Sequence, residues 1–310
     1  MTTTGAGTAV LRELRFRAMG TDAHLAVVGG DDAMLRDGEQ HVRELEGLWS
    51  RFLDTSELSG LNRHAGSVVV VSPQTFELVT KAVAAWRRTG GRFDPTVGAA
   101  LAAHGYDRTF TEVVRSVAPA PDPSLRPAPG PGDIGLVSGV NAIIMPVGVS
   151  LDAGGIGKGL AADLIAQALL ASGADGALVN LGGDLRAVGR PPSSEGWSIT
   201  VPDPLQPDRE LLRLAIPEGA VATSSRLRRR WRTTSGEAHH LIDPSTGRPA
   251  ETDVVAVTVV AGEAWWAEAL TKALFLGGPA ALEDIDDVHA VVVTADGTRH
   301  ATADLEATLR

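Results

Sequence analysis

A glycine-rich stretch with one lysine is the part of this sequence best suited to hold a phosphate group. In residues 149–163, VSLDAGGIGKGLAAD, a short apolar strand ends at Leu151 and Asp152 follows it. Four glycines then lead into an Ala/Leu-rich segment with helical spacing. Glycines let the main chain approach a ligand closely, and the start of a helix carries positive partial charge. We therefore expect a phosphate site with Lys158 as its cation, the alternative being a strand-to-helix turn whose lysine is only solvated.

Two common phosphate-binding loops do not match this stretch. A Walker A loop requires Ser or Thr after its lysine, where this chain has Gly159, and the glycine spacing does not fit GxGxxG. Small, hydroxyl or acidic residues also end expected strands in several distant segments. These segments are residues 19–21, 94–96, 180–184, 223–225 and 240–243. If they converge with the glycine stretch, the cleft suits a phosphate-bearing ligand with a hard cation such as Mg²⁺, which takes oxygen ligands.

The adjacent histidines His239 and His240 leave three roles open. One histidine acts as a general base together with Asp243, both bind a metal, or both are strand residues on opposite faces without a catalytic role. Adjacent side chains on a strand point apart, so joint metal binding is the least favoured of the three. A serine hydrolase is excluded because the chain lacks a GxSxG elbow.

The composition is that of an acidic globular protein. The chain has 310 residues, with 44% hydrophobic residues, 21% charged residues and a net charge of −10. This charge argues against broad nucleic-acid binding. Cysteine is absent, which excludes disulfides, thiol nucleophiles and cysteine zinc sites. No apolar run approaches membrane-spanning length, and the N-terminal residues lack an uninterrupted apolar segment, so we expect a cytoplasmic protein without an integral membrane segment.

The apolar pattern predicts strands and helices that mix without regular βαβ alternation. A hairpin with its turn near Gly20 is followed by expected helices at residues 31–52, from Ser72-Pro73 to Gly90-Gly91, and at residues 263–276. Residues 55–62 are expected to form a capped turn near the surface. Further strands are expected at residues 177–181, 185–188, 197–201, 211–216 and 254–261, with a last hairpin turning at Asp296-Gly297. The pattern favours an α+β fold over a doubly wound sheet.

A proline- and glycine-rich segment at residues 117–133 interrupts the chain. Its sequence, VAPAPDPSLRPAPGPGD, is too rich in these residues to join a core and is expected to form an exposed loop. We interpret it as an insertion rather than a domain boundary, because the glycine stretch downstream needs partners from both sides. The expected organisation is a single domain over residues 1–310.

Taken together and in order, these segments resemble the ApbE-type FAD:protein FMN transferase family, the flavin transferases. The matching stretches are Met19-Gly20-Thr21, SELSGLN at 56–62, FDPTVGAAL at 93–101, LDAGGIGKGLAAD at 151–163, LVNLGGDL at 178–185, VATSS at 221–225, HLIDPSTGRP at 240–249 and AEALTKALFLGG at 267–278. The resemblance implies a two-lobed α+β architecture of mixed sheet and helices, with the active site between the lobes.

The resemblance implies an enzyme that binds FAD, cleaves its pyrophosphate with Mg²⁺ and attaches FMN to a Thr or Ser hydroxyl of a partner flavoprotein, with AMP as the leaving group. It places His240, Asp243 and Lys158 near the reacting phosphate as catalytic residues. The residues that it places at FAD are Met19, Asn62, Asp94, Thr96, Asp152, Lys158, Thr223 and Ser224. A Mg²⁺-dependent FAD pyrophosphatase that releases FMN and AMP, and a non-catalytic flavin-binding protein, are the alternatives.

The last matching stretch departs from the family pattern at its metal ligands. The resemblance puts the main-chain carbonyl of Gly155 near the metal, but Glu268 and Lys272 stand where the family has Asp and Thr. Residues four apart share a helix face, so the two side chains should meet. Two interpretations are open: Lys272 supplies part of the metal's charge beside a weakened Mg²⁺ site at Glu268, or the two residues form an ordinary ion pair and the metal step is lost or changed.

Overall fold

An antiparallel sheet of eight strands forms the centre of the part of the chain that the structure describes. The computed structural model describes residues 10–120 and 125–306. Every neighbouring pair of strands in the sheet is antiparallel. The strands, in spatial order, are β1 (Leu11–Ala18), β2 (Thr21–Val28), β6 (Gly176–Leu181), β7 (Asp184–Gly189), β10 (Gly219–Ser225), β15 (Val254–Ala261), β16 (His289–Thr294) and β17 (Arg299–Ala301).

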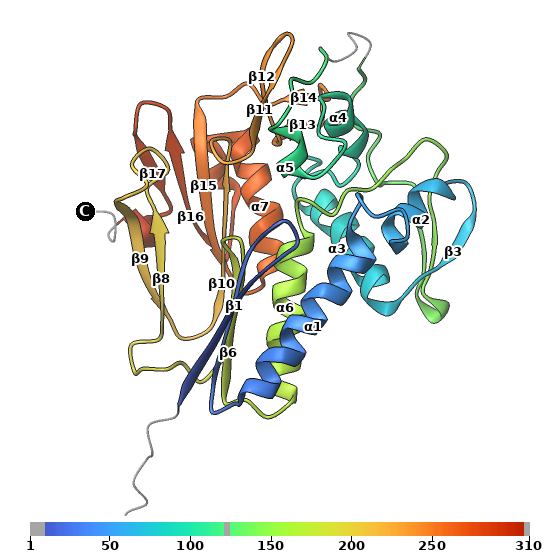
Figure 1. Cartoon of the computed structure of the whole chain (residues 1–310). Helices are drawn as coiled ribbons and strands as arrows, with labels where there is room; N and C mark the ends of the chain where they lie inside the picture. Colours follow the sequence, from blue (N-terminus) through green and yellow to red (C-terminus); the bar gives the residue numbers. More distant parts are fainter. Residues whose placement is uncertain (1–9, 121–124, 307–310) are drawn as a thin grey trace, which may run out of the picture.

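Helices cover one face of this sheet and a β-hairpin covers the other (Figure 1). The helices α1 (Asp32–Trp49), α6 (Gly157–Ala171) and α7 (Ala264–Gly277) pack on what we call the helix face. The hairpin of β8 (Trp197–Pro202) and β9 (Glu210–Ile216) packs on the hairpin face. Side chains alternate between the two faces along each strand, so the same strand contributes to both apolar layers. Val179 packs with the helices, whereas its neighbour Leu178 packs against Trp197.

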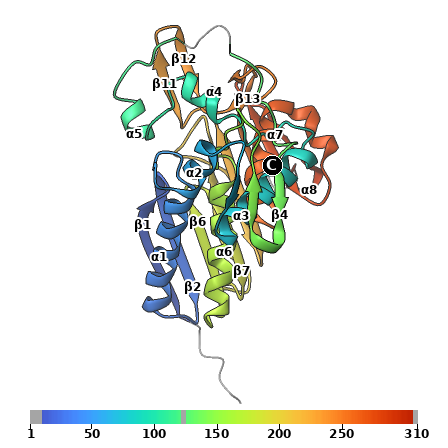
Figure 2. The ribbon, with the colours of Figure 1, turned by 90° about the vertical axis from the view of Figure 1, so that its right-hand side faces the viewer.

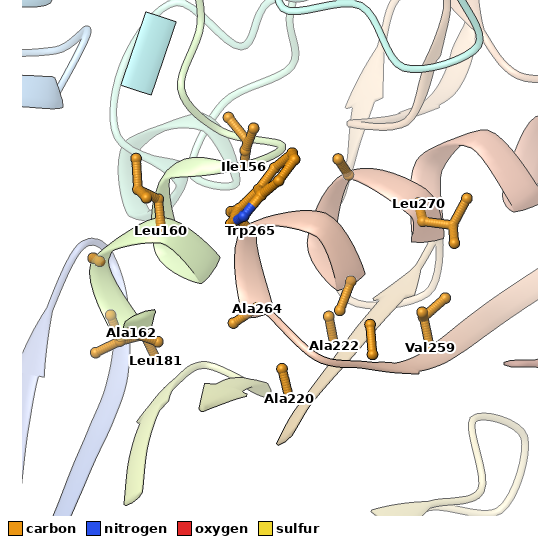
Figure 3. Close-up of a cluster of buried hydrophobic side chains, with 14 of the residues drawn as sticks. Ile156, Leu160, Ala162, Leu181, Ala220, Ala222, Val259, Ala264, Trp265 and Leu270 are labelled. Atoms are coloured by element: carbon orange, nitrogen blue, oxygen red, sulfur yellow. The ribbon is translucent and has the colours of Figure 1, made fainter. Parts of the chain in front are cut away.

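Small residues let α6 and α7 pack closely against each other and against the sheet. Figure 3 shows alanines of α6, β10 and α7 among the larger side chains Leu160, Trp265 and Leu270. A Cβ atom at Gly159 would lie only 2.3 Å from the main-chain oxygen of Ala264, so a larger residue at this position would push the two helices apart. This close contact brings the beginnings of both helices together.

A second, smaller group of elements lies beyond the helices (Figures 1 and 2). Helices α2 (Glu57–Arg63) and α3 (Pro73–Arg88) pack with a sheet of β3 (Val68–Val70), β5 (Ala142–Ile144) and β4 (Gly135–Val137) around a separate apolar cluster. Another cluster, around Tyr106 and Trp231, joins short elements to two hairpins. These are α4 (Gly98–Ala103), α5 (Phe110–Val113), β11 (Arg230–Thr233) with β12 (Gly236–His239), and β13 (Ile242–Asp243) with β14 (Arg248–Pro249).

The remaining elements are short. They are the 3₁₀-helices η1 (Ser138–Val140) and η2 (Pro279–Asp284) and the helix α8 (Ala303–Glu306). Among residues 10–120 and 125–306, no helix is both long and apolar enough to cross a membrane. The single-domain organisation of residues 1–310 stays a prediction.

The α+β class predicted from the sequence is confirmed, together with the expected hairpins and long helices. The first hairpin turns at Met19 and Gly20, which both have positive φ, of 51° and 67°, as a two-residue turn between twisted strands requires. The expected strands at residues 177–181 and 185–188 pair with each other as β6 and β7. The helix expected at residues 263–276 is α7.

Two expectations about loops are corrected. Residues 55–62 were expected to form a capped turn, but most of them belong to α2, whose first turn is capped by the Ser56 hydroxyl accepting from the Ser59 N–H. Part of the segment at 117–133 joins a core after all, because Ala118 is buried and pairs with Thr233 at the edge of β11. Residues 121–124 of that segment lie outside the described residues.

Candidate active site

Two lysines and two carboxylates meet on the helix face of the sheet. We call Lys158, Asp184, Glu268 and Lys272 the charged cluster. Lys158 lies in the first turn of α6 and donates to Asp184 at the start of β7 and, over 2.8 Å, to Oε1 of Glu268 on α7. The Glu268 side chain is fully buried, and only 4% of the Asp184 side chain is exposed. The cluster therefore joins the start of α6, the middle of α7 and the start of β7 around buried charge.

Both carboxylate oxygens of Glu268 already have partners. Its Oε2 accepts from the Gly159 N–H over 2.8 Å, and Lys272 Nζ lies 3.4 Å from the Oε1 that Lys158 also contacts. Burial would raise the pKa of Glu268, but the charges of Lys158 and Lys272 outweigh burial and lower it. Burial would likewise lower the pKa of Lys158, but the two carboxylates raise it above its ordinary value. Glu268 and Lys158 are therefore both charged at neutral pH.

A buried aspartate fixes the position of α7 relative to α6. The Asp163 carboxylate accepts from the N–H groups of Ala264 and Trp265 over 2.9 Å each, which caps the first turn of α7 from another helix. Arg186 Nε lies 3.4 Å from the same carboxylate. Burial raises the pKa of Asp163 to about 6, against the opposing hydrogen bonds. This contact sets the orientation from which α7 presents Glu268.

The glycine stretch before α6 is held by polar side chains. Asp152 accepts from the Gly154 N–H over 2.7 Å and lies 3.1 Å from Arg51 Nε. The Asn62 side chain donates to the carbonyl of Leu151 and accepts from its N–H, over 3.0 and 2.8 Å. Asn62 and Asp152 thus shape the loop that leads into the phosphate-binding candidate. Their predicted contact with FAD stays a prediction.

Asp94 and Thr96 form a compact turn beside that loop. The Asp94 carboxylate accepts from the main-chain N–H and the hydroxyl of Thr96, over 2.8 and 2.6 Å. The Thr96 hydroxyl in turn accepts from the Gly130 N–H, and the carbonyl of Pro95 accepts from the Asp152 N–H. Burial raises the pKa of Asp94, opposed by the bonds from Thr96. The turn therefore connects the glycine stretch to the end of the loop at 117–133.

Thr223 and Ser224, which the resemblance places together at FAD, point to opposite faces of the sheet. The Ser224 hydroxyl lies 2.7 Å from that of Thr271 on α7, on the helix face. The Thr223 hydroxyl lies 2.9 Å from that of Thr258 and lines a cavity of about 220 Å³ on the hairpin face. Other polar residues that line this cavity are His24, Asn180, Ser198, Thr200, Ser225 and Arg228. Adjacent residues of a strand cannot both face one pocket through the same layer.

Met19 lies at the end of the sheet where the glycine turn between β6 and β7 also lies. The Gly182 N–H donates to the carbonyl of Asp22, and a Cβ atom at Gly182 would collide with the Thr21 side chain. The Met19 side chain packs against the main apolar cluster. The first hairpin and the Gly182-Gly183 turn are thus in direct contact at this end.

The two adjacent histidines have different surroundings. The His240 ring Nδ1 lies 3.3 Å from the carbonyl of Arg229. Burial lowers the pKa of His240 well below 6.5, and the positive charges of Arg229 and Lys272 lower it further. His239 instead lies 3.2 Å from the carbonyl of Ala250 and packs edge-on against Phe275. Because they face different partners, the histidines do not form a joint metal site.

The Asp243 side chain forms its hydrogen bonds within the turn that follows it. Its carboxylate accepts from the N–H and the hydroxyl of Ser245, over 2.8 and 2.7 Å, and its carbonyl accepts from the Gly247 N–H. Within the described residues no hydrogen bond joins Asp243 to His240, so the expected pairing of these two residues is not seen. Asp243 shapes the turn that follows the histidines.

The donor groups at the expected metal position do not fit a divalent cation. A Cβ atom at Gly155 would lie 3.5 Å from Lys272 Cε, so the Lys272 side chain runs directly beside the main chain of Gly155. The Nζ atom of Lys272 lies 3.0 Å from the main-chain carbonyl oxygen of Glu268 and 3.4 Å from its Oε1. In the part of the chain that is described, no group of three His, Asp or Glu residues has the geometry of a metal site. The ammonium group of Lys272 therefore lies beside Glu268, the expected side-chain donor, and its stem lies beside Gly155.

Two residues of the site were not identified individually from the sequence. Asp184 follows the Gly182-Gly183 turn at the start of a strand, and this position was a usable signal for a carboxylate at a strand end. Arg51 pairs with Asp152, but nothing in the local pattern of either residue indicates the other.

Comparison with known proteins identifies the family. The model of the ApbE family matches residues 19–293. The FAD:protein FMN transferase of Treponema pallidum is 32% identical, over 84% of this chain and 77% of that protein, and the one of Klebsiella pneumoniae is 28% identical, over 89% and 87%. The crystal structure of the ApbE protein from Thermotoga maritima superposes with a TM-score of 0.81 at 26% identity, over 97% of this chain and 100% of that chain. The chain therefore belongs to the ApbE family.

Proposed function

We propose that this chain is an FAD:protein FMN transferase. It cleaves the pyrophosphate of FAD and attaches FMN by a phosphoester bond to a Thr or Ser hydroxyl of a partner flavoprotein, with AMP as the leaving group. The observation that carries the proposal is the charged cluster at the start of α6, where Lys158 contacts both Asp184 and Glu268, in a chain whose relatives are named for this reaction. The partner is expected in the cytoplasm.

The cluster supplies what a pyrophosphate requires. Lys158 and Lys272 bring two ammonium groups to the start of α6, whose partial positive charge also attracts an anion. Of the two lysine side chains, 18% and 17% are exposed, so a ligand can reach both. Positive groups that are already in place stabilise charge that develops on phosphate oxygens without further reorganisation.

His240 suits the role of general base. The hydroxyl oxygen of the acceptor attacks the phosphorus on the FMN side, the bond from this phosphorus to the bridging oxygen breaks, and AMP leaves with that oxygen. The hydroxyl proton passes to the imidazole of His240. The lowered pKa of His240 keeps the ring neutral at pH 7, and only the neutral ring can accept a proton. Lys158 and Lys272 balance the charge on the departing phosphate.

The test is an incubation of purified protein with FAD and a threonine-containing acceptor peptide, followed by mass spectrometry. The peptide should gain the mass of FMN as AMP appears. His240→Ala should slow transfer by roughly 10²–10⁴-fold, the usual contribution of a general base. The matched control is His239→Ala, which removes the same side chain from a residue that faces Ala250 and should keep most of the transfer rate.

Other outcomes of the same experiment distinguish the alternatives. Free FMN and AMP without a modified peptide would indicate an FAD pyrophosphatase, and intact bound FAD would indicate a flavin-binding protein. Because the pKa of His240 is lowered, the acid limb of the pH–rate profile should lie below pH 6.5. Unchanged transfer by His240→Ala would remove this residue from the mechanism.

A further inference from the structure

We propose that the ammonium group of Lys272 takes the place of a divalent cation, so that the protein binds FAD and neutralises its pyrophosphate without a metal ion at this position. The inference rests on the proposed function, because it concerns the same site. It depends on three observations: the position of Lys272, the charge balance of the cluster, and the use of lysine in this chain.

The position of Lys272 is the first observation. Its Nζ lies 3.0 Å from the carbonyl and 3.4 Å from Oε1 of Glu268, and its stem passes beside Gly155. These are the oxygen and main-chain groups that a cation at this point would contact. Both oxygens of the Glu268 carboxylate are already used, by two lysines and by the Gly159 N–H. A metal ion would have to displace Lys272 to gain a ligand.

The charge balance is the second observation. The cluster contains two ammonium groups and two carboxylates, all buried or nearly buried, and its formal charge is zero. A divalent cation would add two positive charges next to Lys158 and Lys272 with no further carboxylate to offset them. Like charges at such distances repel strongly where water is excluded. An incoming pyrophosphate, in contrast, brings negative charge that both ammonium groups attract.

The use of lysine is the third observation. Only three of the 28 basic residues of the chain are lysines, and two of these three are Lys158 and Lys272. The rest are arginines, which carry a broad planar group, whereas lysine ends in a compact point charge on a flexible stem. The site thus holds the basic residue that this chain otherwise rarely uses. A compact cation is also the shape that replaces a small metal ion.

The role of Lys272 is electrostatic. Its ammonium donates hydrogen bonds to oxygens of the bound pyrophosphate while the phosphorus–oxygen bond to the acceptor forms and the bond to the bridging oxygen breaks. The proton of the acceptor hydroxyl goes to His240, and the electron pair of the broken bond leaves with AMP. No metal-bound species is needed for this balance.

The first test measures FAD binding by calorimetry, with either EDTA or MgCl₂ present. Wild-type protein should bind FAD with the same dissociation constant in both buffers. Lys272→Thr should bind about tenfold or more weakly in EDTA, because a hydrogen bond to a charged group is lost, and should recover affinity in MgCl₂. Lys81→Thr is the matched control, because Lys81 is the third lysine and lies over Trp265 at the surface, and its binding should match the wild type in both buffers.

A second measurement observes the ammonium groups directly. Protein labelled with ¹⁵N-lysine has three Nζ signals, and FAD added in EDTA should shift those of Lys158 and Lys272 while leaving that of Lys81 in place. Mn²⁺ titrated into FAD-free protein should give no tight site by electron paramagnetic resonance in the wild type. These readouts remain usable even if Lys272→Thr fails to fold.

The outcomes separate this inference from the proposed function. Wild-type binding of FAD that requires Mg²⁺, or a tight Mn²⁺ site in the wild type, would overturn the role of Lys272 even if FMN transfer occurs. FAD binding that is independent of metal, with both lysine signals shifted, supports the inference even if no peptide is modified. In that last case the proposed transferase function fails and the assignment of Lys272 as the resident cation stands.

Discussion

The two faces of the central sheet differ in how their polar side chains are arranged. On the helix face the side chains of the charged cluster are paired with one another, and water has little access to them. On the hairpin face Thr223 and Arg228 line a cavity of about 220 Å³. Both faces are built by the same strands, because alternate residues of β7 and β10 point in opposite directions. The helix face therefore holds paired, buried charges, and the hairpin face contains a cavity.

The difference between the two faces indicates where this fold can bury charged side chains. Burying four charged groups requires that each has a partner, since an unpaired buried charge costs several kcal/mol. The starts of α6 and α7 supply main-chain N–H groups for Glu268 and Asp163. The helix face can thus fix two ammonium groups toward a phosphate, whereas the hairpin face offers hydroxyls and a cavity.

Glu268→Gln tests the helix face with the largest expected effect. The substitution keeps the size of the side chain but removes the charge that Lys158 and Lys272 share. We expect a loss of about 3–5 kcal/mol in the free energy of unfolding, as is usual when one partner of a buried ion pair is removed. Urea unfolding followed by circular dichroism at pH 7 measures it.

The control for this substitution is a surface ion pair. Glu237→Gln removes a carboxylate that lies 3.7 Å from Arg230 and is 69% exposed, and it should leave the urea midpoint nearly unchanged. If Glu268→Gln were as mild as Glu237→Gln, the helix face would not depend on paired buried charge, and the contrast between the two faces would fail.

Asp163→Asn tests how the helix face is assembled, through its pH dependence. The pKa of Asp163 is about 6 in the folded chain and 3.8 in its ordinary state, so the folded state binds this proton more tightly than the unfolded state. The stability that the group contributes is therefore fully present below pH 3.8 and is lost as the pH rises through about 6. A shift of this size corresponds to roughly 2–3 kcal/mol.

The measurement compares urea unfolding of the wild type and Asp163→Asn from pH 4 to pH 7. The wild type should lose stability relative to the variant over this range. Asp175→Asn, which changes a half-exposed aspartate paired with Arg190, should follow the wild type at every pH. Parallel curves for wild type and Asp163→Asn would show that Asp163 does not titrate near pH 6.

Much of the architecture was accessible from the sequence because it depends on local patterns. Alternating apolar residues and turn glycines define the hairpins, and the cap-then-proline pair at Ser72-Pro73 marks the start of α3. Helix α2 was missed because seven residues are too few to show helical periodicity. The burial of Ala118 was missed because it depends on β11, which is more than 100 residues away in the chain.

The candidate site was predicted as a set of segments but not as a set of contacts. The contact between Glu268 and Lys272 follows from their spacing on one helix, and the structure confirms this contact. The pairing of Lys158 with Asp184 depends on how α6 packs on the sheet, which no local pattern encodes. The opposite orientation of Thr223 and Ser224 was available from strand alternation, but the resemblance grouped both at one ligand.

The comparison of Thr223→Val with Ser224→Ala tests the two faces with the smallest expected effects. Each substitution removes one hydrogen bond between hydroxyls, to Thr258 or to Thr271, and should lower the free energy of unfolding by about 1 kcal/mol. Their effects on FAD binding should differ. Ser224 lies on the helix face, where the charged cluster is proposed to bind the pyrophosphate, so its loss should weaken FAD binding a few-fold in calorimetry, whereas Thr223 faces the cavity on the opposite side and should alter affinity less. Equal weakening by both variants would mean that the ligand contacts both faces, and the division between fixed charge and open space would no longer hold.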